Sequence, residues 1–125
     1  MKSVSLGSAF LFALFSLSAH AADPAAPVKK VDGMLVDSKG MTVYTFDKDT
    51  ANSGKSACTG GCAQNWPAVH AGDAALAAPY SVVTRDDGTK QLAYNGKPLY
   101  TFAKDKKPGE KHGDKAMNAW HVVTD

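Results

Sequence analysis

The chain has 125 residues and a formal net charge of +2, with 21% charged and 44% hydrophobic residues. Its length suits one small domain with a modest core. Because positive and negative charges nearly balance, we expect neither nucleic acid nor an anionic membrane surface as a partner.

Residues 1–21 have the features of a secretory signal peptide. Lys2 provides a positive start, residues 6–17 form an apolar run, and Ala19-His20-Ala21 has the small-x-small form of a cleavage site. The run is too short to span a bilayer as a helix. We expect cleavage after Ala21 and a soluble protein that is periplasmic or secreted. Because no cysteine stands at the cleavage site, we expect no lipid anchor.

Short strands separated by turns are predicted along the rest of the chain. Residues 22–31 are rich in Ala and Pro and are predicted to be a flexible leader, followed by a domain over residues 32–125. Asn95-Gly96 is a strong hairpin signal, because both residues tolerate the positive φ of a tight turn. Strands are expected at residues 34–37, 41–46, 81–85, 91–94, 98–102 and 120–124, with a further turn at 86–88. Only residues 73–78 favour a turn or two of helix, so the fold class is mostly β.

Part of the sequence occurs twice, at a constant offset of 56 positions. GMTVYTFDKD at residues 40–49 returns as GKPLYTFAKD at residues 96–105, and a tryptophan follows each copy. This self-similarity predicts two homologous hairpin-based repeats, at about 33–70 and 88–125. The repeated residues are Tyr44, Phe46, Asp49 and Trp66 in the first copy and Tyr100, Phe102, Asp105 and Trp120 in the second.

The rings of the two copies are predicted to form one core. Side chains two apart on a strand share a face, so Tyr44 and Phe46 point the same way, as do Tyr100 and Phe102. A small β domain depends on such large rings for buried area. We therefore expect a shared aromatic core with pseudo-two-fold symmetry.

The repeated aspartates have two interpretations. Asp commonly accepts backbone N–H bonds in the turn after a strand, which is the structural interpretation of Asp49 and Asp105. The alternative is a calcium loop with Asp47, Asp49 and Asn52, although the central glycine and terminal glutamate of such a loop are missing.

Cys58 and Cys62, in CTGGC, are the only cysteines in the chain. An even number of cysteines in an exported protein indicates a disulfide, here one that shapes the loop before Trp66. The alternative is a metal or redox site, which usually has Cys-x-x-Cys spacing instead.

His70, His112 and His121 remain after the signal peptide, and none has the i, i+4 spacing of a helical zinc site. We expect no metal site and no cofactor. A weaker alternative is copper or haem held by His112, His121 and Met117, because ligands converge in space and not along the chain. No nucleophile elbow, P-loop or dinucleotide fingerprint is present, so no catalytic residue and no enzymatic activity are predicted.

Several segments, in order, resemble one family. They are Gly-x-x-(Val/Leu)-Tyr-Thr-Phe-x-x-Asp in both copies, CTGGCAQNWP at residues 58–67, and WHVV at residues 120–123. Over residues 33–123 the chain resembles a bacterial secreted-repeat family, described as predicted lipoproteins with a Tyr-x-(Phe/Trp/Tyr)-x-x-Asp motif. The resemblance implies an exported repeat protein, and the family is largely of unknown function.

These patterns together predict an exported binding or envelope-associated accessory protein. Its partner is an unknown protein or small ligand. The alternative is a periplasmic redox or metal accessory protein that uses copper or haem.

Overall fold

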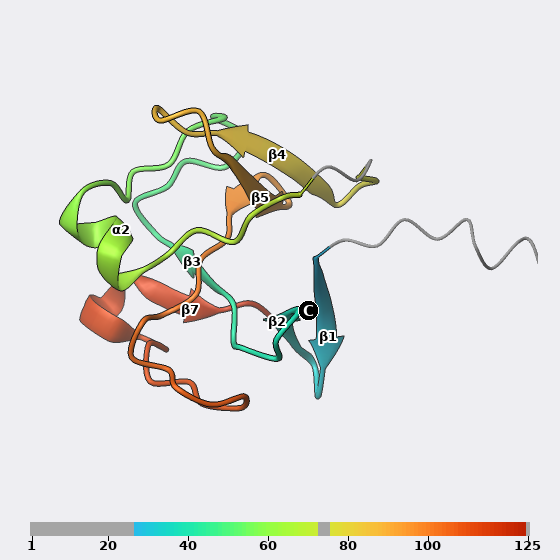
Figure 1. Ribbon diagram of the computed structural model, residues 1–125, viewed down its shortest axis with the longest axis vertical. Helices are drawn as coiled ribbons and strands as arrows, with labels where there is room; N and C mark the ends of the chain where they lie inside the picture. Colours follow the sequence, from blue (N-terminus) through green and yellow to red (C-terminus); the bar gives the residue numbers. More distant parts are fainter. Residues whose placement is uncertain (1–26, 73–75, 125) are drawn as a thin grey trace, which may run out of the picture.

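The computed structural model describes residues 27–72 and 76–124 (Figure 1). The predicted signal peptide, residues 22–26 of the predicted leader and residues 73–75 lie outside this part of the chain. The elements are β1 (Val28–Val31), β2 (Met34–Asp37), β3 (Tyr44–Phe46), α2 (Gly61–Asn65), β4 (Tyr80–Thr84), β5 (Lys90–Tyr94), β6 (Lys97–Pro98), the 3-10 helix η2 (Ala116–Asn118) and β7 (Trp120–Val122). The fold is mostly β, as predicted, and residues 76–78 of the possible helix are not helical.

The first hairpin begins inside the segment that the sequence assigned to a leader. Strand β1 pairs antiparallel with β2, and Val28, which is 8% exposed, packs in the aliphatic core. The turn between the strands is Asp32-Gly33, with φ angles of 51° and 81°. The predicted leader over residues 22–31 is therefore wrong for its last four residues, because Asp-Gly between valine-containing strands is itself a hairpin signal.

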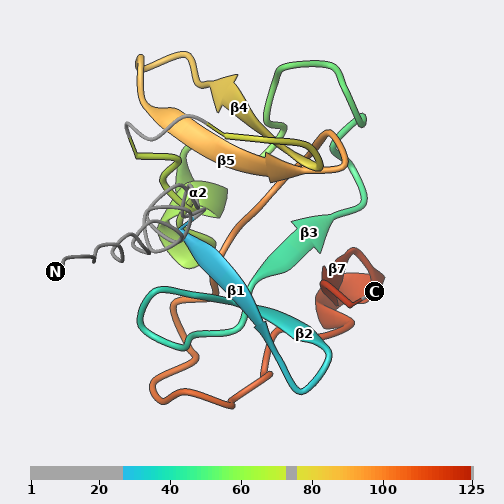
Figure 2. The ribbon, with the colours of Figure 1, turned by 90° about the vertical axis from the view of Figure 1, so that its right-hand side faces the viewer.

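The second hairpin lies where the sequence predicted it. Strand β5 pairs with β4 on one side and with β6 on the other, and Asn95-Gly96 forms the turn between β5 and β6, with φ angles of 51° and 81°. Figure 2 shows the β4–β5 hairpin at the top of the molecule and the β1–β2 hairpin below it, with β3 between them.

The two repeats exchange their tryptophan-bearing segments. Strand β3 of the first repeat pairs antiparallel with β7 of the second, so that Phe46 lies opposite Trp120. In the same way Tyr100 of the second repeat forms a bridge with Ala68, just after Trp66 of the first. Each hairpin unit is thus completed by a segment of the other repeat, which is an arrangement like domain swapping within one chain.

Tyr44 and Tyr100 mark the junction between the two units. Their backbones form a reciprocal antiparallel bridge, with N···O distances of 2.7 and 2.9 Å in the two directions. Other backbone bonds also occur in matching pairs, such as Leu35 N–H to Val123 C=O and Leu92 N–H to Val69 C=O, both 2.9 Å or shorter. These paired contacts give the pseudo-two-fold symmetry that the duplication predicted.

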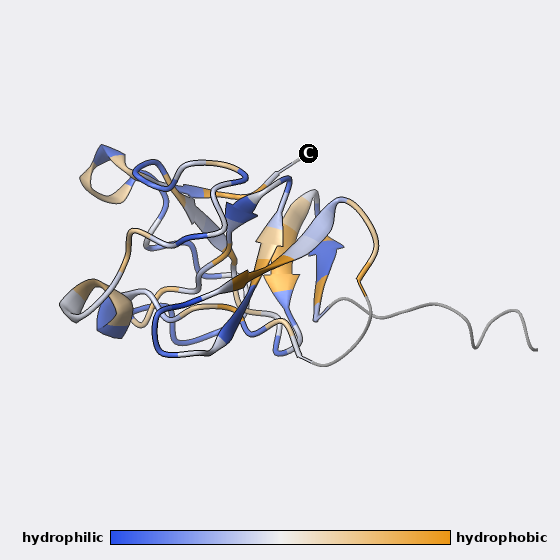
Figure 3. Ribbon diagram, turned by 90° about the horizontal axis from the view of Figure 1, so that it is seen from above, coloured by the Kyte–Doolittle hydropathy of each residue, from blue (hydrophilic) through white to orange (hydrophobic). Residues whose placement is uncertain are grey.

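The interior has an aliphatic and an aromatic part, and hydrophobic residues concentrate on the central strands (Figure 3). The aliphatic part is formed by Val28, Leu35, Val43, Val69, Ala71, Leu92, Leu99 and Val123. The aromatic part holds the six repeated rings, of which five are buried and Phe102 is partly buried. Within residues 27–72 and 76–124, no helix is long and apolar enough to cross a membrane.

Candidate functional site

The repeated rings form a four-membered stack through the centre of the molecule. Trp66 and Trp120 lie face to face, with ring centroids 3.7 Å apart and planes 2° apart. Phe102 stacks on the outer side of Trp66 and Phe46 on the outer side of Trp120, each with centroids 4.1 Å apart. Every Phe–Trp stack therefore joins one repeat to the other, and the rings are occupied in packing.

The repeated tyrosines and aspartates also pair across the repeats. The Tyr44 hydroxyl donates to Asp105 Oδ2, and the Tyr100 hydroxyl donates to Asp49 Oδ2, both at 2.6 Å. The second oxygen of each carboxylate accepts a backbone N–H, from His112 at Asp105 and from Ala57 at Asp49. Both aspartates are buried, with exposed fractions of 5% and 6%. Each carboxylate thus ties a loop to the core.

The tyrosine hydroxyls stay protonated under ordinary conditions. Burial raises the pKa of Tyr44 and of Tyr100 well above the usual value, and the hydrogen bonds to Asp105 and Asp49 raise both further. A neutral phenol is the form that donates to a carboxylate. This geometry supports a structural role for the Tyr-x-Phe-x-x-Asp motif.

Asp47, Asp49 and Asn52 of the possible calcium loop have separate surroundings. Asp47 Oδ2 lies 2.8 Å from Nε2 of His121, while Asp49 binds Tyr100 inside the core. The backbone N–H of Asn52 donates to Gly96 C=O, and the Asn52 side chain fills the space that a Cβ at Gly96 would need.

Cys58 and Cys62 form a disulfide, with Cα atoms 5.2 Å apart, at the start of α2. Arg85 fixes the loop before the disulfide. Its guanidinium donates to the Cys58 carbonyl at 2.5 Å, to Ser56 Oγ at 3.1 Å and to Gln91 Oε1 at 2.6 Å. Gln91 is fully buried and donates to the Leu99 carbonyl. These contacts make the disulfide loop a rigid part of the surface.

Sequence reasoning missed both Arg85 and Gln91. Gln91 had a signal, because it is a polar residue that opens the apolar stretch Leu92 to Tyr94. Arg85 stands before a polar turn, and nothing in the sequence around it indicated its contacts with the disulfide loop.

Three surface hollows border the disulfide loop, and two of them lie between that loop and the β4–β5 turn. Their lining includes Lys48, Lys55, Ser56, Thr59, Arg85 and Asp86. Most of these side chains are polar and several carry charge. The face around the disulfide loop, which we call the loop-1 face, is therefore suited to polar recognition.

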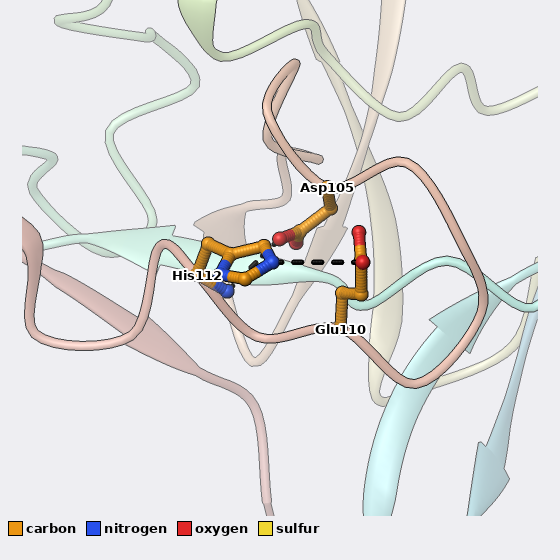
Figure 4. A group of neighbouring side chains, drawn as sticks. All are labelled: Asp105, Glu110 and His112. Carbon is orange, nitrogen blue, oxygen red and sulfur yellow. Dashed lines mark hydrogen bonds and ion pairs between the residues drawn. The ribbon is translucent and has the colours of Figure 1, made fainter.

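The corresponding loop of the second repeat, residues 104–115, has no cysteine and contains a different cluster. Asp105, Glu110 and His112 each present a ligand-type atom, and these three atoms lie within 4.8 Å of one another (Figure 4). His112 Nε2 lies 3.6 Å from Glu110 Oε2, with side-chain exposures of 60% and 29%. No other such group of three His, Cys, Asp or Glu residues occurs in the part of the chain that the structure describes.

The remaining candidates lie in different surroundings. His121 on β7 contacts Asp47, Met117 in η2 is 79% exposed, and His70 is an exposed residue whose backbone bridges to Gln91. His112 and His121 thus have different carboxylate partners. The ligand set His112, His121 and Met117 gains no support from these contacts.

A family model described as a secreted repeat of unknown function matches the chain twice, over residues 26–70 and 81–124. Each match contains one copy of the repeated motif, which confirms the resemblance drawn from the sequence. No curated protein and no solved structure matches the chain.

Proposed function

The chain belongs to the family described as a secreted repeat of unknown function, and from this premise we propose that it is an exported, non-enzymatic accessory module that binds a partner through its loop-1 face. We place it in the periplasm or outside the cell, because residues 1–21 have the pattern of a cleaved signal peptide.

One observation carries the proposal: the repeated aromatic residues are buried in the core, except that Phe102 is only partly buried. Tyr44, Tyr100 and Trp120 have no exposed surface, and Phe46 and Trp66 have 7% and 4%. Residues so enclosed cannot contact a partner, so recognition falls to the loops that they hold in place.

The loop-1 face is favoured over the other surfaces because it is both hollowed and rigid. The disulfide and the Arg85 contacts hold its backbone, which lowers the conformational entropy lost on binding. Lys55, Thr59 and Asp86 are exposed around the hollows, where they offer donors and acceptors to a polar ligand or a protein.

The repeat supplies a matched test of this surface. Lys55 and Lys111 lie in corresponding loops of the two copies, and both are exposed. The mature protein, Lys55→Glu and Lys111→Glu are each immobilised and exposed to envelope extract of the producing bacterium, and retained components are quantified by mass spectrometry. We expect Lys55→Glu to lose a component that Lys111→Glu and the parent retain.

Equal retention by all three proteins, or selective loss with Lys111→Glu, would contradict the loop-1 assignment. Thermal unfolding of both variants checks that each reversal leaves the fold intact, because exposed lysines contribute little to stability.

A further inference from the structure

The two loops that follow the repeated motif are held in different ways. In the first repeat, the loop after Asp49 contains the Cys58–Cys62 disulfide. In the second, the loop after Asp105 has no covalent link, and Glu110 and His112 lie against each other and against Asp105 (Figure 4). The chain therefore offers a side-chain cluster in one copy where the other has a cross-link.

The carboxylates of this cluster are already oriented by the backbone. Asp105 Oδ2 accepts from Tyr44 and Oδ1 accepts from the His112 N–H. Glu110 Oε1 accepts from the N–H groups of Lys106 and Lys107, which leaves Oε2 directed at the His112 ring. The same two backbone bonds lower the pKa of Glu110, so its carboxylate is ionised at neutral pH.

The spacing of the ligand atoms suits a small cation. Two ligands at about 2.0 to 2.2 Å from one zinc ion lie roughly 3.2 to 3.6 Å from each other in a tetrahedral site. His112 Nε2 and Glu110 Oε2 are 3.6 Å apart, and the Asp105 oxygen lies within 4.8 Å of both. The His112 side chain is 60% exposed, so its ring has room to move toward both carboxylates.

We propose that Asp105, Glu110 and His112 form a binding site for a divalent zinc-class ion, which closes the second loop as the disulfide closes the first. Imidazole nitrogen and carboxylate oxygen are both ligand types that Zn²⁺ takes, and three protein ligands leave the fourth position open for water. Two carboxylates and a neutral imidazole also balance the charge of a divalent ion. Ca²⁺ is disfavoured, because it takes six to eight oxygen ligands. This site is separate from the loop-1 face.

The backbone bonds of this loop act as outer support for the proposed site. Tyr44 holds Asp105, and the N–H groups of Lys106 and Lys107 hold Glu110, in the way that second-shell partners orient metal ligands. The His112 N–H bond to Asp105 links two of the ligands directly. The loop is thus pre-organised before an ion arrives.

The test is calorimetric titration of chelator-stripped, full-length mature protein with Zn²⁺, with thermal unfolding as a second measurement. We expect one ion per chain and a rise in melting temperature at excess Zn²⁺. His112→Ala and Glu110→Gln are each expected to weaken the affinity at least about ten-fold, since even outer-shell changes cost 10- to 100-fold. The metal-free variants are expected to melt close to the parent, because His112 is exposed and Gln keeps an oxygen acceptor at Glu110.

His121→Ala is the matched control, because His121 also contacts a carboxylate but lies outside the cluster. It is expected to bind Zn²⁺ like the parent. The absence of measurable Zn²⁺ binding by the parent overturns the proposal. Affinity that is unchanged in His112→Ala, or that falls equally in His121→Ala, overturns it too.

Discussion

At the scale of single residues, the spacing within Tyr-x-Phe-x-x-Asp follows from contacts between the two copies. The strand places Tyr44 and Phe46 on one face, and the aspartate three residues further on starts the loop. The hydroxyl of each tyrosine then reaches the aspartate of the other copy. One motif therefore supplies a donor and an acceptor, and two copies satisfy each other.

The cross-repeat hydrogen bonds should be measurable one at a time. Tyr44→Phe and Tyr100→Phe keep the ring but leave a buried carboxylate with one partner fewer. We expect each to lower the free energy of unfolding by about 1.5 to 3 kcal/mol, as for hydrogen bonds to charged groups. Urea unfolding followed by tryptophan fluorescence measures this loss. Tyr94→Phe is the control, since its hydroxyl has an exposed bond of 3.4 Å to Lys30, and losses equal to that control would refute the role of the buried bonds.

Gly113 is required because of ring packing and not because of its backbone angle. A Cβ atom there would lie 2.6 Å from Trp66 Cη2 and 3.0 Å from Phe102 Cδ2. We expect Gly113→Ala to cost about 1 to 3 kcal/mol, the usual range for overpacking. At Gly61 the same change meets nothing within 4 Å, so Gly61→Ala should cause no loss of stability. If Gly113→Ala and Gly61→Ala shifted the urea midpoint of unfolding by the same amount, the packing explanation would be wrong.

At the scale of elements, the stack makes each Phe–Trp pair a contact between repeats. Phe46→Ala is expected to cost about 3 to 5 kcal/mol, the range for a buried phenylalanine. Phe102→Ala should cost less, because Phe102 is only partly buried while Phe46 is 7% exposed. Urea midpoints test both the size and the order of the two losses. A parent-like midpoint for Phe46→Ala would refute its place in the core.

The sequence allowed the Asn95-Gly96 hairpin and the disulfide to be predicted, but not the exchange between the repeats. Asn95-Gly96 and the alternating strands carry local signals, and the repeat itself located the six rings. Because both copies have the same aromatic residues, the sequence does not show whether Phe46 stacks on Trp66 of its own repeat or on Trp120 of the other. Chain connectivity decides between these two partners. The Asp32-Gly33 hairpin was missed because the composition before it, rich in Ala and Pro, favours a leader.

The Asp105, Glu110 and His112 cluster was also beyond sequence reasoning. Its members are separated by five and two positions inside an irregular loop, where no helix or strand period relates spacing to direction. Of the three, the sequence made only His112 a candidate metal ligand, and Asp105 was predicted to have a structural role. Only the backbone bonds of the loop place Glu110 beside it.

At the scale of the whole molecule, the exchange makes the two repeats one cooperative unit. A peptide of residues 27–72 lacks Phe102, which stacks on its Trp66, and a peptide of residues 76–124 lacks Phe46, which stacks on its Trp120. Each peptide also lacks one strand of the β3–β7 pair. We expect each peptide alone to be unfolded and an equimolar mixture to regain the folded spectrum. Amide NMR dispersion measures both states, and native-like dispersion in either peptide alone would contradict the exchange.

The fold should also lose stability at alkaline pH. Burial, followed by the bonds to Asp105 and Asp49, raises the folded-state pKa of Tyr44 and Tyr100 above the value of about 10 found in an unfolded chain. The unfolded chain therefore releases these two protons first. The stability that the two hydroxyls contribute is fully present below about pH 10 and falls as the pH rises above it, by up to about 1.4 kcal/mol per pH unit for each tyrosine.

Urea unfolding between about pH 9 and 11 tests this dependence, with tyrosinate absorbance followed in parallel. Of the four tyrosines in the chain, Tyr44 and Tyr100 should ionise only as the tryptophan signal of the folded state is lost. The double variant Tyr44→Phe/Tyr100→Phe should be less stable at neutral pH but should lose the part of the alkaline slope that these hydroxyls cause. If all four phenols ionised together near pH 10 while the fold stayed intact, the buried Tyr–Asp pairs would not be what joins the two repeats.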